Sequence, residues 1–247
     1  MIKMIKRIYT IILNRASIIK TVYYNFKYLP FGQAKYMPMI VAKGVIIRGK
    51  GKIFLEWDPA SSPNIYLGGK ALKWMPEPRK IPTIFYIEGE LHIKAGFYFG
   101  SGGGMEIERG ATLTFDRNFN ATAKCTIICR NNISFGQDVL VSWDTLIMDS
   151  DQQTIFNINS IEDRNYDGSI QIGNHIWISS KVTILKNTIV GSGCVIGSET
   201  LVHGNFNREN MLIAGNPARI CKEKIRWSQE RPLKTSIKTG EHHKDCR

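Results

Sequence analysis

The chain has 247 residues, 43% of them hydrophobic, and a formal net charge of +12. This is enough for one sizeable domain with appendages. Residues 1–52 hold 11 Lys and Arg and no acid, residues 53–218 hold 13 basic and 17 acidic residues, and residues 219–247 hold 9 and 4. Nucleic-acid-binding proteins usually carry a basic stripe and a recognisable motif on the folded body, and no such motif is present, so nucleic acid is excluded as the expected partner. Basic ends fit an anionic membrane surface, a ligand with several phosphates, or solvated termini.

Residues 1–40 are predicted to form an amphipathic helix followed by a linker. Apolar residues recur on one helical face at spacings of three and four: Ile2, Ile5, Tyr9, Ile12, Ala16, Ile19 and Tyr23. The longest apolar run, Ile8 to Leu13, is shorter than the ~7–15 residues of a secretory signal core and the ~20 of a membrane span. We therefore expect a cytoplasmic protein. Two interpretations of the helix stay open: it docks on its own domain or a neighbouring subunit, or it lies peripherally on the anionic inner face of a membrane.

Residues 41–220 are predicted to form an all-β domain built as a β-helix. From Ile172 onward an aliphatic residue recurs at every sixth position: Ile178, Ile184, Val190, Ile196 and Val202. Shorter runs with the same spacing begin at Ile81, Ile107 and Phe135. A period of six fits neither an α-helix nor an ordinary hairpin. It indicates hexapeptide repeats, in which each short strand points its marked residue into a narrow core.

The repeat is interrupted before Ile172. Ile147 lies 25 residues earlier, one more than four steps of six. The residues at about 148–169 must therefore include an excursion from the coil. A polar loop on a rigid scaffold is a common place for binding and catalytic residues. The basic segment 221–247 is predicted to be a C-terminal tail.

No metal site is expected from the sequence. The five cysteines are scattered and none forms a CxxC pair, which favours reduced thiols. His242, His243 and Cys246 lie close together in the tail. Closed structural zinc sites use four preorganised ligands, so three residues at a chain end are a poor match.

The stretch "IQIGNHIWISSKVTILKNTIVGSGCVIGSETLV", followed by "NMLIAGNPARICKEKIRW", resembles the hexapeptide-repeat acyltransferases. These include galactoside, maltose and serine acetyltransferases and the sugar O-acetyltransferases of bacterial surface-polysaccharide synthesis. The AGNPA segment, Ala214 to Ala218, is the most specific feature. The resemblance covers most of the chain. It implies a left-handed parallel β-helix, a homotrimer with active sites between subunits, and acetyl-coenzyme A (acetyl-CoA) in the groove.

The resemblance also implies which residues bind the coenzyme. Matched position by position, they are Trp177, Ser180, Ser198, Gly215, Asn216, Pro217, Arg219 and Lys222. Trp177 and the two serines match the pantetheine channel, and residues 215–217 match the turn over the coenzyme. Arg219 and Lys222 match cations beside the phosphates, which favour fixed positive charge. Coil packing for Trp177 and solvated charge for the two cations are the alternative roles.

In the enzymes that the chain resembles, the excursion often reads D-x-D-x-H and the histidine is the general base. Here it reads DSDQQ: Asp149 and Asp151 hold the acidic positions and Gln153 stands where the histidine would be. A glutamine amide can hydrogen-bond a hydroxyl but cannot take its proton near neutral pH. The candidate replacements are His175, which can also be read as a turn residue, and either aspartate if its pKa is raised.

These features predict an acetyl-CoA-dependent O-acetyltransferase acting on a sugar hydroxyl in capsule, O-antigen or exopolysaccharide synthesis. Its turnover is expected to be impaired by Gln153. Two alternatives stay open. One is a non-catalytic trimeric scaffold that binds the coenzyme. The other is a nucleotide-sugar N-acyltransferase, whose amine acceptor is a nucleophile once it is deprotonated.

Overall fold

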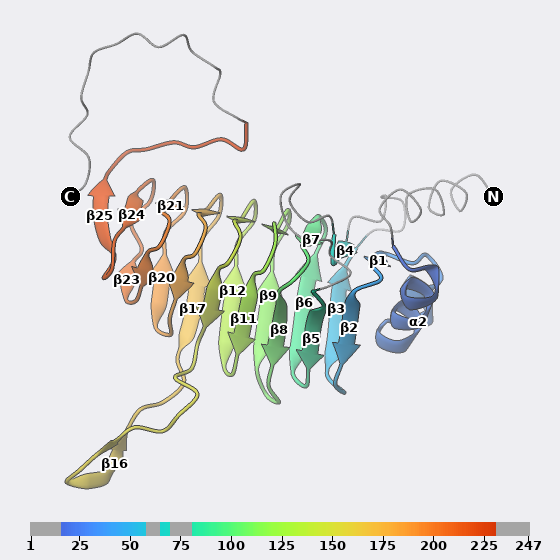
Figure 1. The fold of residues 1–247 in the computed structure, drawn as a ribbon, viewed down its shortest axis with the longest axis horizontal. Helices are drawn as coiled ribbons and strands as arrows, with labels where there is room; N and C mark the ends of the chain where they lie inside the picture. The colour runs from blue at the N-terminus through green and yellow to red at the C-terminus, as the bar shows by residue number, and fades with distance from the viewer. Residues whose placement is uncertain (1–15, 58–64, 70–80, 231–247) are drawn as a thin grey trace.

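The computed structural model describes residues 16–57, 65–69 and 81–230. They form a prism of stacked coils with a helix at one end (Figure 1). Each coil contributes one strand to each of three parallel sheets. This architecture confirms the predicted left-handed β-helix of hexapeptide repeats.

The first two sheets follow the chain order of the coils. Sheet 1 contains β1 (Met39–Val41), β4 (Ile65–Leu67), β7 (Phe97–Phe99), β10 (Asn120–Ala121), β13 (Leu140–Val141), β18 (Trp177–Ile178), β21 (Val195–Ile196), β24 (Leu212–Ala214) and β25 (Arg219–Lys222). Sheet 2 contains β2 (Val45–Arg48), β5 (Thr83–Ile87), β8 (Gly104–Ile107), β11 (Thr126–Cys129), β14 (Leu146–Met148), β19 (Thr183–Ile184) and β22 (Leu201–Val202).

The third sheet completes each coil. Sheet 3 contains β3 (Lys52–Glu56), β6 (Glu90–Lys94), β9 (Thr112–Phe115), β12 (Asn132–Phe135), β17 (Ser169–Ile172), β20 (Thr188–Val190) and β23 (Asn205–Phe206). Coil 1 is β1–β3. Coil 5 is β13, β14 and β17, coil 6 is β18–β20, coil 7 is β21–β23, and coil 8 begins at β24. The first corner joins sheet 1 to sheet 2, the second joins sheet 2 to sheet 3, and the third leads back to sheet 1.

The predicted core positions are buried from Ile172 through Val202. Trp177 pairs with Val195, 18 residues on, as three steps of six require. Earlier coils are longer: Asn120 pairs with Leu140 across 20 residues and with Tyr98 across 22. Phenylalanines fill these wider coils, and their rings lie 4.4–6.3 Å apart: Phe97, Phe99, Phe115, Phe119 and Phe135. The narrower late coils are filled by isoleucine and valine.

Helix α2 (Ile18–Tyr28) begins after Ser17, whose side chain accepts a hydrogen bond from the Lys20 N–H. Its buried residues are Thr21, Tyr24 and Asn25. The apolar face predicted from the sequence is instead exposed at Ile19 and Tyr23. The remainder of that face, residues 2–12, lies outside the described residues. The short helix α3 (Phe31–Ala34) follows, and its Gln33 amide donates to the Leu55 carbonyl at 3.0 Å.

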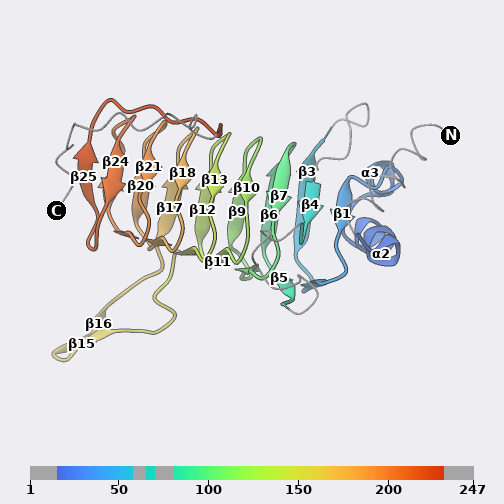
Figure 2. The same ribbon diagram turned by 45° about the horizontal axis from the view of Figure 1, so that its top comes forward.

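The excursion leaves coil 5 at the second corner, after β14, and returns at β17. It ends in an antiparallel hairpin of β15 (Phe156–Asn157) and β16 (Ser160–Arg164) that projects from the prism in both ribbon views (Figures 1 and 2). The ladders continue across it, because β14 pairs with β19 and β12 pairs with β17. The excursion is therefore an insertion into an otherwise regular scaffold.

The C-terminal strand β25 runs antiparallel to β24, so sheet 1 extends beyond residue 220. The chain then runs back along the coils as far as residue 230 (Figure 2). The Ile225 N–H donates to the Asn210 carbonyl, and the Trp227 indole N–H donates to the His175 carbonyl. The tail residues His242, His243 and Cys246 lie outside the described part of the chain. Among the described residues, no helix has the length and apolar character needed to cross a bilayer.

Candidate functional site

The residues matched to the coenzyme turn and channel lie in a column at the first corner. Ser180 of coil 6 and Ser198 of coil 7 place their hydroxyl oxygens 3.3 Å apart. Residues 215–217 form the same corner of coil 8. There the Gly215 N–H donates to the Thr200 hydroxyl at 3.3 Å, and Gly215 has φ of 105°, a conformation that favours glycine. The coil repeat thus brings together residues that are far apart in sequence.

Trp177 and the two cations flank this column on sheet 1. The Trp177 indole N–H donates to the Ser142 hydroxyl at 3.2 Å, and the side chain is 37% exposed. Arg219 pairs with Ala214 across β24 and β25, and Lys222 pairs with Leu212. Both cations are exposed. The structure therefore places two positive charges at one end of the column and an aromatic ring farther along it.

Asp149 lies at the root of the excursion and is fully buried. Its carboxylate accepts from the backbone N–H groups of Arg130 and Asn131 at 2.7 and 2.9 Å. Its carbonyl accepts from the Gly168 N–H at 2.8 Å. Burial raises the pKa of Asp149, although the two backbone donors oppose that shift. With both oxygens engaged and no contact with solvent, Asp149 anchors the two ends of the excursion and is badly placed to reach an acceptor.

Asp151 is exposed, and a cation of the next coil holds it. Its carboxylate accepts from the Lys186 ammonium and from the Asn165 amide. The Lys186 hydrogen bond lowers the pKa of Asp151, and Asn165 lowers it further. A carboxylate with a lowered pKa is a weaker base. The Asn165 amide also donates to the Gln153 carbonyl at 2.9 Å, while the residue itself remains exposed.

His175 lies at the third corner, away from the excursion. It is a turn residue with φ of 55°. Its ring stacks on Trp227 at 4.4 Å, and its Nε2 lies 3.2 Å from the Trp227 carbonyl oxygen. The structure does not bring His175 together with Asp151 or Gln153.

The sequence interpretation missed His203, which follows β22 at the second corner, the corner that carries the excursion. Ile184 pairs with Val202, so His203 lies one coil beyond Leu185 and beside the part of the corner that holds Lys186. Its side chain is exposed, and its charge contributes to lowering the pKa of Asp151. The 18-residue repeat of the late coils could have placed it there.

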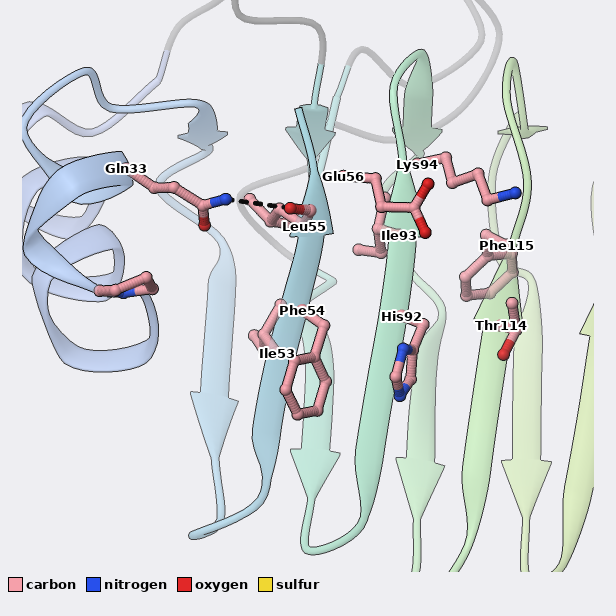
Figure 3. A pocket seen from close by; sticks show the side chains of 11 residues that line it. Gln33, Ile53, Phe54, Leu55, Glu56, His92, Ile93, Lys94, Thr114 and Phe115 are labelled. Atoms are coloured by element: carbon pink, nitrogen blue, oxygen red, sulfur yellow. Dashed lines mark hydrogen bonds between the residues drawn. The ribbon is translucent and has the colours of Figure 1, made fainter. Parts of the chain in front are cut away.

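A hollow of about 380 Å³ lies on the outer face of sheet 3, at coils 1 to 3 (Figure 3). Phe54 and His92 stack there with ring centroids 4.6 Å apart, between the charged side chains of Glu56 and Lys94. It contains none of the residues predicted for the site. In the described part of the chain, no group of three or more His, Cys, Asp and Glu side chains is arranged to hold a metal ion.

No protein-family model matches the chain. It is 28% identical over 149 residues to the putative lipopolysaccharide biosynthesis O-acetyl transferase WbbJ of Escherichia coli (strain K12), covering 56% of this chain and 75% of WbbJ. It is 32% identical over 127 residues to the polysialic acid O-acetyltransferase of Escherichia coli O1:K1 / APEC, covering 51% of this chain but only 39% of that protein.

Among solved structures, the polySia-specific acetyltransferase NeuO superposes with a TM-score of 0.58 at 23% identity, covering 77% of this chain and 75% of NeuO. At that identity the likeness concerns the fold. In fold the chain is a left-handed β-helix of hexapeptide repeats, and in sequence it is a relative of proteins named as bacterial O-acetyltransferases.

Proposed function

We propose that the chain is an acetyl-CoA-dependent O-acetyltransferase acting on a sugar hydroxyl of a bacterial surface polysaccharide, with active sites between the subunits of a homotrimer. The names of its relatives support the reaction class. One observation carries the intersubunit arrangement. The coenzyme residues lie at the first corner and the excursion at the second, with sheet 2 between them. A closed threefold assembly can place the first corner of one subunit against the second corner of the next.

The order of residues along the prism suits an elongated phosphate-bearing cofactor. Arg219 and Lys222 lie beside coil 8, followed by Ser198 in coil 7 and by Ser180 and Trp177 in coil 6. Parallel strands are about 4.8 Å apart, so this column spans several coil spacings. The cations would meet the phosphates, the serine hydroxyls would meet the amides of the pantetheine arm, and the thioester would point toward coil 5. Coil 5 is where the excursion leaves the scaffold.

In the proposed reaction, the acceptor oxygen attacks the thioester carbonyl and a new ester bond forms as the carbon–sulfur bond breaks. The proton of the acceptor hydroxyl passes to the departing coenzyme A thiolate, directly or through a base. Gln153 can orient the hydroxyl but cannot carry this proton. General-base assistance is worth about 10²–10⁴ in rate. We therefore expect slow acetylation.

The same observation favours a second candidate function, a trimer that binds the coenzyme without turnover. Asp149 is buried, Asp151 is paired with Lys186, and Gln153 replaces the base. Purified protein offered acetyl-CoA with a panel of sugars and amino sugars separates the possibilities. Coenzyme A release with sugar hydroxyls supports the proposal, and release only with amino sugars supports N-acylation. Binding without release supports the scaffold.

A further inference from the structure

The first described helix has two faces with opposite environments. One face docks on coil 1 through buried hydrogen bonds. The Asn25 amide donates to the Met39 carbonyl at 2.8 Å, and the Thr21 hydroxyl accepts from the Val41 N–H at 3.1 Å. The Tyr24 hydroxyl accepts from the Ile47 N–H at 3.1 Å. These contacts fix the rotation of the helix, so its other face points away from the prism in a defined direction.

That other face is apolar and exposed. It consists of the residues that we call the N-terminal patch: Ile18, Ile19, Tyr23, Phe26 and Phe31. Ile19 is 82% exposed and Phe31 is 71% exposed. The Phe26 and Phe31 rings lie 6.2 Å apart, which joins α2 and α3 into one surface. Contiguous apolar surfaces of this kind mark interaction sites, whereas isolated exposed side chains do not.

The surroundings of the patch are positively charged. Residues 16–55 contain seven Lys and Arg and no Asp or Glu. Lys27 lies over the Tyr23 and Tyr28 rings at 5.9 and 4.7 Å, and Lys35 lies over Tyr36 at 5.0 Å. Both lysines are exposed, at the border of the patch. Their partners in these contacts are aromatic rings, so their charges remain available to an anionic surface.

Charge decides between the two main partners for such a patch. A second copy of the patch would bring the same lysines against one another, which is unfavourable. An anionic lipid surface offers both a negative potential and an apolar layer. A helix with apolar and aromatic side chains on one face and lysines at its border is typical of segments that lie in a membrane interface.

We propose that the N-terminal patch inserts into the interface of an anionic lipid bilayer and holds the prism with its N-terminal end against the membrane. The excursion leaves from coil 5 and points away from the prism, so this contact would leave it accessible (Figure 1). The proposal concerns location and is independent of acyl transfer.

The test uses the full chain and sedimentation with vesicles of phosphatidylglycerol and phosphatidylcholine, compared with phosphatidylcholine alone. We expect binding to the anionic vesicles only, weakened by 0.5 M salt because screening shortens the electrostatic attraction. The double substitution Ile19→Ser and Phe31→Ser should reduce the partition coefficient at least tenfold, about 1.4 kcal/mol. The matched control is Ile158→Ser in the excursion hairpin, where the side chain is 97% exposed and far along the chain. It should bind as the wild type does.

Three results would overturn the proposal. The first is failure of the wild-type protein to bind anionic vesicles. The second is unchanged binding by a folded double variant. The third is a fall in oligomeric mass in the double variant without vesicles, which would assign the patch to contacts between subunits. Melting temperature checks the folding of the variants. Ile19→Leu with Phe31→Leu, which keeps the patch apolar, should retain binding.

Discussion

Asp149 and Asp151 are two residues apart, and the structure predicts opposite consequences for their replacement. Asp149→Ala removes the acceptor for two buried backbone donors, the N–H groups of Arg130 and Asn131. Each buried donor left unsatisfied costs about 1–3 kcal/mol. Relief of the buried carboxylate offsets part of this. We expect the free energy of unfolding to fall by about 2–5 kcal/mol.

Asp151→Ala is the matched control. Its partner is the Lys186 ammonium in an ion pair open to solvent, and exposed ion pairs contribute about 0–1 kcal/mol. Urea unfolding midpoints, compared at unchanged slope, measure both effects. Equal costs for the two variants, or a cost below about 1 kcal/mol for Asp149→Ala, would refute the view that Asp149 anchors the excursion.

Three further predictions concern chemistry and pH. Gln153→His should raise coenzyme A release at least tenfold, about 1.4 kcal/mol of barrier, and His203→Gln in that background should preserve the gain; loss of wild-type turnover in His203→Gln alone would assign the base to His203. Saturating coenzyme A should raise the melting temperature, and Arg219→Glu should diminish that rise; an unmoved wild-type melting curve would contradict the cofactor assignment. Burial raises the pKa of Asp149 above its ordinary 3.8, so its contribution to stability is present below that value and is lost as the pH rises through the folded pKa. Asp149→Asn should therefore show a smaller decline in urea midpoint between pH 4 and pH 7, and an unaltered decline would place the titration elsewhere.

The sequence predicted the fold because the inward positions of hexapeptide repeats are dictated by burial. The residues from Ile172 to Val202 have a strict period and occupy the core as expected. The longer coils before them were less regular in sequence, because extra residues fall in the corners and in longer strands while phenylalanine fills the added width.

The candidate site was harder to predict, because partners decide the role of a polar residue. The DSDQQ stretch does not reveal that Asp149 turns inward to the N–H groups of Arg130 and Asn131 while Asp151 meets Lys186. The helix shows the same limit. Its docked face is polar in sequence, and hydrogen bonds to coil 1, rather than apolar burial, decide which side faces the protein.

The antiparallel strand β25 has a consequence for assembly. A parallel β-helix has two open ends, and each end is a template on which another chain can add strands and grow into a fibre. At one end α2 packs against β1, and at the other β25 reverses the strand direction and carries Arg219 and Lys222. Charged residues on an edge strand discourage such growth. The cations assigned to the coenzyme phosphates therefore also guard the open end of the solenoid. Neutralising both should promote fibril formation in addition to weakening coenzyme binding, so light scattering should accompany any binding assay of that variant.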